Sequence, residues 1–140
     1  MNMVCPNEGK HYFLAICFGW SGSTAGDLHL RLFQNDYTPV EGSVLADFTE
    51  ADFGGYAEQV LHTSDWDEPV NVSDVEQIDL DSAPSFGCTG GPDNTVYGWY
   101  LVYTGTGICV LAQRFDSPRF MTVGAVETLD PFRVKLKTFA

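Results

Sequence analysis

Histidine, which often serves as a metal ligand or as a general base near neutral pH, occurs three times in this chain, as His11, His29 and His62. None of the three has another His, a Cys or a carboxylate at a spacing typical of a metal site. His11 falls in a stretch with helical spacing, and His29 falls on the polar side of an alternating stretch. We therefore predict structural or solvated histidines and no metal site.

Carboxylates supply the hard oxygen ligands that calcium prefers, and the closest group is Asp79-Leu80-Asp81, with Asp74 and Glu76 nearby. On a strand, Asp79 and Asp81 would share one face. The stretch lacks the spaced acidic positions, the central Gly and the terminal Glu of an EF-hand loop. We expect a solvated acidic edge that guards a strand against unwanted pairing, with a calcium site as the alternative.

Nucleophilic catalysis and phosphate binding have no recognisable motif in this sequence. Gly19-Trp20-Ser21-Gly22 lacks the G-x-S-x-G spacing of a nucleophile elbow. The pair Gly90-Gly91 is not followed by the Lys of a phosphate-binding loop. Glycoside hydrolysis needs two carboxylates at a set distance in space, and among 19 acidic residues some pair always looks suitable. We therefore predict that the chain is not an enzyme and binds no cofactor.

The four cysteines, Cys5, Cys17, Cys88 and Cys109, show neither a C-x-x-C motif nor a Cys/His ligand spacing. Cys17 and Cys109 lie inside apolar runs and are expected to be buried thiols. A domain of this size does not need disulfides and no signal peptide is recognised, so we expect synthesis in a reducing cytosol. No apolar run approaches the roughly 20 residues of a membrane span, so no membrane partner is expected.

The charge of the chain is strongly acidic and unevenly distributed. The formal net charge is −12, and residues 36–93 contain only carboxylates and no Lys or Arg among their charged side chains. Such a surface repels phosphate, so we expect no nucleic-acid partner. The acidic stretch is expected to be a solvated surface that maintains solubility, and the alternative is that part of it meets a basic partner surface.

Hydrophobic periodicity predicts one helix and several short strands. The helix is expected over Asn7 to Phe18, because Pro6 precedes it and apolar residues follow with helical spacing. One helical turn is expected at Thr49 to Asp52. Strands are expected at residues 28–34, 56–62, 96–104, 108–115, 118–126 and 132–136, with one or two short exposed strands within 63–93. Because the runs 96–104 and 108–115 are apolar on both faces, both are expected to be central strands.

Seven to nine short strands with one N-terminal helix predict a mainly β fold. The architecture expected is a β-sandwich, of which a jelly roll is one form. At 140 residues we expect a single domain. Within it, residues 1–27 would form an N-terminal helix or arm with a Gly/Ser-rich connection, and residues 28–140 would form the β-sandwich.

Several stretches resemble small virion proteins of tailed bacteriophages. The similarity lies in PNEG at residues 6–9, LRLFQNDYTP at 30–39, ADFTEADF at 46–53 and GYA at 55–57. The stretches VYGWY at 96–100 and LAQRF at 111–115, with the final alternating strand, resemble the C-terminal half of the same family, and residues 66–93 match least. Members of this family are mostly head-decoration (cement) proteins or other minor structural proteins.

The resemblance implies a non-enzymatic virion protein made in the host cytoplasm. The position expected is the outer surface of the phage head, where the chain would bind the major capsid protein, stabilise the lattice and associate with itself as a dimer or trimer. Residues 1–18 could form an arm that docks on a neighbour. The alternatives are a tail, adaptor or baseplate component, and a carbohydrate-binding β-sandwich with exposed aromatic residues around Trp66.

Aromatic and apolar side chains are the usual anchors of protein interfaces. Of the tryptophans, Trp99 lies in a strong strand and is expected in the core, whereas Trp66 lies in an acidic stretch and is the better candidate for exposure. The candidate interface residues are Tyr12, Phe13, Ile16, Tyr37, Phe53, Tyr56 and Trp66.

Overall fold

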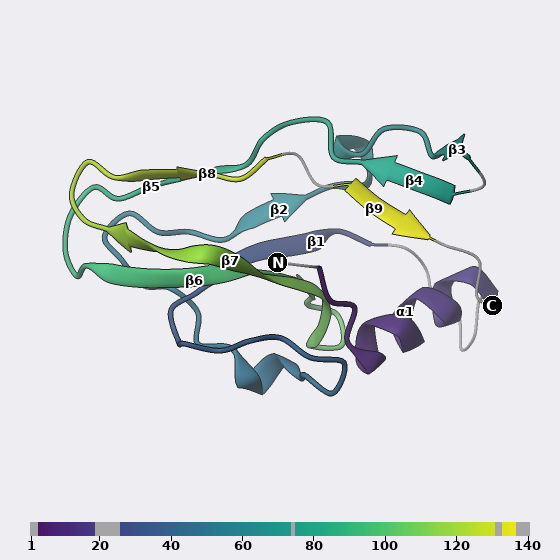
Figure 1. Cartoon of the computed structure of the whole chain (residues 1–140), viewed down its shortest axis with the longest axis horizontal. Helices are drawn as coiled ribbons and strands as arrows, with labels where there is room; N and C mark the ends of the chain where they lie inside the picture. The colour runs from purple at the N-terminus through teal and green to yellow at the C-terminus, as the bar shows by residue number, and fades with distance from the viewer. Residues whose placement is uncertain (1–2, 19–25, 74, 131–132, 137–140) are drawn as a thin grey trace.

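The computed structural model describes residues 3–18, 26–73, 75–130 and 133–136 (Figure 1). Within them one α-helix, α1 (Asn7–Phe18), precedes all the strands. The strands are β1 (Leu28–Phe33), β2 (Gln59–Leu61), β3 (Val70–Val72), β4 (Val75–Asp79), β5 (Ser85–Gly87), β6 (Asn94–Tyr103), β7 (Ile108–Met121), β8 (Val126–Thr128) and β9 (Arg133–Leu136). Two short 3-10 turns, η2 (Leu45–Asp47) and η3 (Thr63–Asp65), flank β2 in the chain.

The strands form three antiparallel sheets in two layers. The main sheet has the order β2-β1-β6-β7, and the other layer consists of a three-stranded sheet β3-β4-β9 and a two-stranded sheet β5-β8. In Figure 1 these two smaller sheets lie end to end above the main sheet. The predicted mainly β fold, a β-sandwich with one short N-terminal helix, is confirmed.

The core between the layers is built from the alternation that the sequence shows in β1. Leu30 and Leu32 point to the same side and pair in register with Leu101 and Trp99 of β6. All four are buried, at 3% exposure or less. On the other layer, Phe86 of β5 belongs to the same buried cluster, as do Leu80 and Leu129, which directly follow β4 and β8. Burial of each such side chain contributes about 1.5–3 kcal/mol, so this layer contact supplies much of the driving force for folding.

The opposite face of the main sheet is also covered. Phe33 and Tyr100 lie on this face, and Phe48 packs against both, with its ring stacked 4.7 Å from that of Tyr100. The chain between β1 and β2, which includes η2, carries Phe48 and runs below the main sheet in Figure 1. The central part of the main sheet is therefore buried on both faces, which explains the apolar runs 96–103 in β6 and 108–112 in β7.

β6 is a central strand as predicted, but the prediction that β7 is also central is wrong, because β7 ends the main sheet. Its outer edge is covered by the start of the chain instead of a strand. Val4 exchanges two backbone hydrogen bonds with Ala112, of 2.8 and 2.9 Å. The Glu8 carboxylate accepts the amide N–H of Cys109 at 2.6 Å. These contacts give an apolar edge strand the cover that a further strand would otherwise provide.

Helix α1 has the predicted bounds and packs on the same chain. Tyr12 is 7% exposed and its ring lies 4.6 Å from that of Tyr103. Gly9 faces the backbone of Val110 so closely that a Cβ would overlap it. The described part of the expected arm, residues 3–18, is thus docked on its own β-sandwich. In the described part of the chain, no helix has the length and apolar character needed to cross a membrane.

Three local predictions need correction. The helical turn expected at Thr49 to Asp52 is wrong: Glu50 bridges Phe33 in extended conformation, and the 3-10 turn is the earlier η2. The strand expected at residues 118–126 is divided between the end of β7, a turn and the first residue of β8. The acidic edge expected at residues 79–81 is not an edge, because β4 lies between β3 and β9.

Gly98 gives a direct test of the packing on the lower face. A Cβ at this position would lie 2.6 Å from ring atoms of Phe33 and would also overlap the carbonyl of Gln113. We predict that Gly98→Ala lowers the free energy of unfolding by about 1–3 kcal/mol, the usual cost of overpacking.

The matched control is Gly87→Ala on β5, where a Cβ meets nothing within 4 Å. That variant should stay within about 0.5 kcal/mol of the wild type in the same urea titration. Equal stabilities for the two variants would contradict the placement of the Phe33 ring over β6.

Candidate functional site

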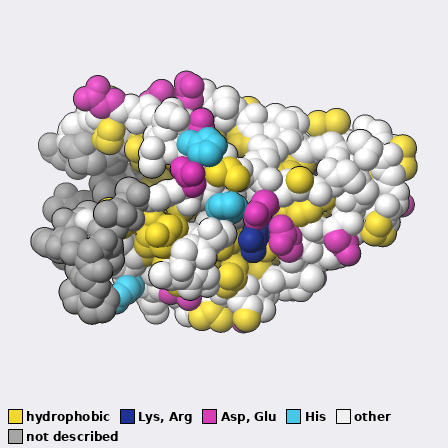
Figure 2. All heavy atoms as spheres, turned by 180° about the vertical axis from the view of Figure 1, so that it is seen from behind, with side chains coloured by type: hydrophobic (Ala, Val, Ile, Leu, Met, Phe, Trp, Pro, Cys, Tyr) yellow, Lys and Arg dark blue, Asp and Glu magenta, His cyan; other side chains and the backbone are white. Residues whose placement is uncertain are grey.

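Charged side chains gather on the side of the sandwich formed by β1 and β2. Figure 2 shows this side from behind: basic, acidic and histidine side chains meet in the middle of the view, beside hydrophobic ones. The residues that pair there come from β1, from the chain just before β2 and from the bridge that follows η2. This is the largest polar cluster joined by ion pairs among the described residues.

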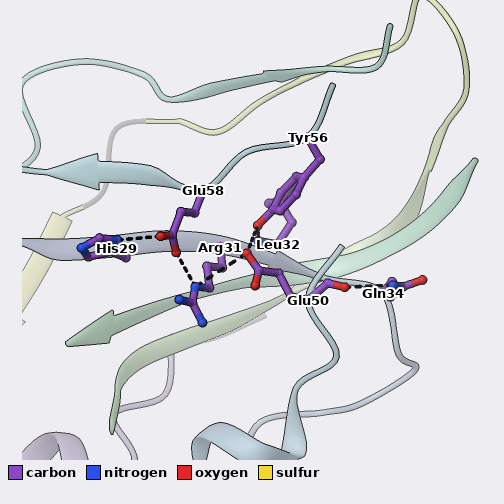
Figure 3. Close-up of polar contacts among 7 residues, drawn as sticks. All are labelled: His29, Arg31, Leu32, Gln34, Glu50, Tyr56 and Glu58. Carbon is purple, nitrogen blue, oxygen red and sulfur yellow. Dashed lines mark hydrogen bonds and ion pairs between the residues drawn. The ribbon is translucent and has the colours of Figure 1, made fainter. Parts of the chain in front are cut away.

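Arg31 stands at the centre of the cluster (Figure 3). Its Nε donates to Oε2 of Glu58 at 2.6 Å and lies 3.6 Å from Oε1 of Glu50. Nδ1 of His29 lies 2.9 Å from the other oxygen of Glu58. His29 and Arg31 share one face of β1 because they are two residues apart on the strand, so a single carboxylate can contact both.

Tyr56 connects this cluster to the backbone of β1. Its hydroxyl accepts the amide N–H of Leu32 at 3.2 Å and donates to Oε1 of Glu50 at 3.0 Å. β2 pairs with β1 only up to Leu30, and the next backbone bridge on that edge is at Phe33. The tyrosine hydroxyl therefore fills a gap in the hydrogen bonding of the strand edge (Figure 3).

The ionisation states follow from burial and from these contacts. Burial alone would raise the pKa of Glu58, but the hydrogen bonds from Arg31 and His29 outweigh it and hold the pKa below its usual value. Burial, assisted by the nearby charge of Glu50, raises the pKa of the Tyr56 hydroxyl far above its usual value. Burial likewise raises the pKa of Tyr100 to about 12.

At neutral pH the arginine is therefore charged, Glu58 is ionised and Tyr56 is protonated. The raised pKa of the tyrosine lies further from neutrality than the usual value, and therefore further from the range that suits proton transfer near pH 7. Each member of the cluster already contacts another member, and the cluster joins β1 to the two segments on its outer side. This arrangement is a structural clamp on a strand edge.

The sequence contains a signal for this clamp that periodicity does not reveal. Arg31 is the only Lys or Arg between Lys10 and Arg114, in a chain with 19 carboxylates. A lone half-buried cation in such a chain requires carboxylate partners. Which carboxylates these are depends on the fold, since Glu50 and Glu58 reach Arg31 only after the chain has turned back along β1.

No group of three His, Cys, Asp or Glu side chains in the described residues is arranged to hold a metal ion. Of the carboxylates considered for calcium, Asp79 is held by two hydrogen bonds from Arg133, of 2.7 and 2.8 Å. His62 pairs with Asp27 at 3.0 Å. The side chain of Glu76 and all of Asp74 lie outside the described residues.

The pKa values of two described thiols are raised. Cys5, Cys88 and Cys109 are free, and Cys88 and Cys109 are buried. Burial, together with the charge of Glu8, raises the pKa of Cys109 to about 12, and burial also raises the pKa of Cys5. Because the thiolate is the reactive form, these shifts keep both groups inert. Burial of Cys109 was predicted correctly, and the side chain of Cys17 lies outside the described residues.

The predicted interface residues lie mostly within the fold. Tyr12 and Phe53 belong to the core, at 7% and 2% exposure. The others are partly buried and pack against one of the two hydrophobic clusters: Phe13, Ile16, Tyr37, Tyr56 and Trp66. The structure does not bring the seven residues together on one surface patch, and their contribution to partner binding stays a prediction. Trp99 is buried, as expected.

The exposed hydrophobic surface lies elsewhere. The exposed large hydrophobic side chains of the described residues are Val40, Val44, Val60, Val70, Val72, Phe120, Val123 and Val126. Val40 also borders an open hollow of about 450 Å³ beside the N-terminal segment, at the Lys10–Glu41 ion pair. These residues could not be predicted from the sequence, because an exposed apolar residue gives the same sequence pattern as a buried one.

Comparison with known proteins adds no family assignment. No protein-family model matches the sequence. A search of curated proteins likewise finds no match.

Glu58→Gln tests the clamp. The variant keeps the shape of the side chain but removes the charge that Arg31 and His29 contact. We predict a loss of about 1 kcal/mol in the free energy of unfolding at pH 7. This is the contribution of a hydrogen bond to a charged group, reduced because the pair is partly exposed to solvent. The control is Glu41→Gln, which removes the charge of the Lys10 partner. Because the Glu41 side chain is 73% exposed, this variant should change the free energy of unfolding by only about 0.3 kcal/mol or less.

The pH dependence of the same variant follows from the sign of the shift. A carboxyl whose pKa is lowered by folding stabilises the protein above its unfolded pKa, and loses that effect as the pH falls through the lowered value. The stability difference between wild type and Glu58→Gln should therefore be full at pH 7 and shrink on acidification below the usual carboxyl range. A difference that grows towards low pH in urea titrations would contradict the ion pairing of Glu58.

Proposed function

We propose that this chain is a non-enzymatic structural protein of a tailed-phage virion, a capsid decoration (cement) protein on the outer surface of the head. The sequence resemblance supplies the class. The structural observation that supports it best is the contrast between interior and surface: no buried side-chain N or O atom of the described residues lacks a hydrogen-bond partner, while eight large hydrophobic side chains are exposed. Three of the eight, Phe120, Val123 and Val126, lie within seven residues of one another in the chain, and an exposed apolar segment of this kind suits contact with another protein.

The mechanism of a decoration protein would be thermodynamic. A chain that binds across neighbouring subunits of the expanded lattice, and not the unexpanded one, stabilises the expanded state by mass action. The partner would be the major capsid protein, and self-association as a dimer or trimer would match a symmetry axis of the lattice. The acidic surface favours basic partner surfaces and opposes contact with packaged nucleic acid.

The carbohydrate-binding alternative, which places its sugar platform around Trp66, gains no support from that residue. Trp66 is partly buried, bridges Leu80 through the backbone and packs against the core. A sugar-stacking platform needs an exposed ring face, and this indole is used by the fold. The adaptor or tail alternative shares the structural class and differs in copy number.

The test is a cryo-electron reconstruction of purified virions that contain the chain. A decoration protein gives density on the outer shell at many lattice sites, on the order of hundreds, whereas an adaptor gives density for about a dozen copies at one vertex. Density only along the tail or at the vertex would replace the decoration role by the adaptor or tail role. Absence of the chain from virions would overturn the structural class.

A further inference from the structure

The most exposed hydrophobic side chains are concentrated at one end of the sandwich. Among the described residues, Phe120, Val123 and Val126 have the three largest exposures of any large hydrophobic side chain, at 74%, 68% and 64%. All three lie in residues 120–126, which we call the 120–126 turn: the end of β7, the connection to β8 and the first residue of β8. In Figure 1 this turn is at the far left, at the opposite end from β3.

The 120–126 turn is held firmly by the rest of the fold. Met121, between the exposed residues, is 1% exposed. Ala125 donates its amide N–H to the carbonyl of Thr122 at 2.8 Å, and Gly124 donates to Cys88 at 2.9 Å. The amide of Cys88 in turn donates to Ala125 at 2.8 Å. Side chains presented on such a fixed backbone lose little conformational entropy when a partner binds them.

The charges near the turn are acidic in excess. Arg119, the basic residue next to the turn, is paired with Glu127 at 3.3 Å. Asp93 is exposed and directly precedes Asn94, which pairs with Met121 across β6 and β7. Asp52 is also exposed and accepts a hydrogen bond from the side chain of Asn94 at 2.8 Å. Within the described residues no ion pair joins Asp52 or Asp93 to a Lys or Arg.

The acidic charges near the turn indicate a partner with basic residues around its binding site. A second copy of the chain would bring the same carboxylates to the contact, in a protein with a net charge of −12, and like charges oppose such an association. A partner with an apolar cleft bordered by Lys or Arg complements both the hydrophobic side chains and the acidic surroundings. The other exposed valines are less exposed, at 40–55%: Val70 and Val72 lie on a short edge strand, Val60 lies on β2, and Val40 borders the hollow at the Lys10–Glu41 pair.

Strand alternation places Phe120, next to buried Met121, on the outer face of the main sheet, and Val126, next to inward-facing Glu127, on the outer face of the other layer. We propose that the 120–126 turn is the docking element of this protein, and that a partner protein holds this end of the sandwich in an apolar, basic-rimmed cleft that contacts Phe120 on one side and Val126 on the other. This inference rests on the proposed function, in which the partner is the shell protein of the phage head. The turn, and not helix α1, then makes the main contact.

The experiment measures, by co-sedimentation over a range of concentrations, binding of the protein to expanded heads of the phage that encodes it. The heads are purified without this chain. Phe120→Thr removes the ring and keeps a residue that favours strands. It should weaken binding about 30-fold, as expected for an interface hot spot, without changing the urea midpoint of the free protein. Val126→Thr, which changes shape very little, should weaken binding in the same direction. The control Val70→Thr should bind like the wild type.

The outcomes separate the two proposals. No binding of the wild type to the heads overturns the proposed function. Wild-type binding that Phe120→Thr and Val126→Thr leave unchanged overturns the docking role of the turn and leaves the decoration role in place. Wild-type binding should also weaken as salt is raised, and less so in Asp93→Asn, whereas binding insensitive to salt contradicts a basic-rimmed cleft. If sedimentation velocity shows that Phe120→Thr dissociates an oligomer, the turn is a contact between copies instead.

Discussion

The structure depends on satisfying the backbone hydrogen bonds at the two edges of the main sheet. A sheet buried on both faces has no water beside its strands, so an unpaired N–H or C=O there costs about as much as a lost hydrogen bond. On the β7 side, the groups that supply the partners are Val4 and the Glu8 carboxylate. On the β1 side, the hydroxyl of Tyr56 bonds the amide of Leu32 between two stretches of backbone pairing. Both edges are closed by elements that are distant in sequence.

The few arginine side chains also hold separate segments of the fold together. Arg31 neutralises part of the carboxylate charge that accompanies Tyr56, and Arg133 fastens β9 to β4 through Asp79. Arg114 contacts Asp36 at 2.6 Å and also the carbonyl of Tyr37, so it ties the lower loop to β7. With these basic residues engaged within the fold, the remaining surface is acidic.

The sequence predicted those features that depend on neighbouring residues. Helix α1 follows from Pro6 and the helical spacing after it, and β1 follows from strict alternation. The edge position of β7 was not predictable in this way, because the segment that covers it lies more than a hundred residues earlier in the chain. The turn at η2 was also misplaced, since the extended pairing of Glu50 with Phe33 overrides the local preference of Thr49 for a helix cap.

The candidate interface shows the same limit in another form. Tyr12 and Phe53 have the composition of interface anchors, but the fold itself uses them in its core. A single sequence records that a position is apolar, and does not record whether its contact lies in the same chain or in another one. The exposure of Phe120 depends on the burial of Met121 in the core and on the turn that joins β7 to β8. Neither of these can be read from the sequence of the segment alone.

The most direct test of the edge closure is amide hydrogen exchange of the free protein, followed residue by residue. The amides of Leu32, Cys109 and Ala112 each donate to a partner outside the strands of the main sheet. If those partners are in place, these amides are protected to nearly the same extent as the amides of the central strand β6. Exchange at the rate of exposed loop amides for these three residues would contradict the account.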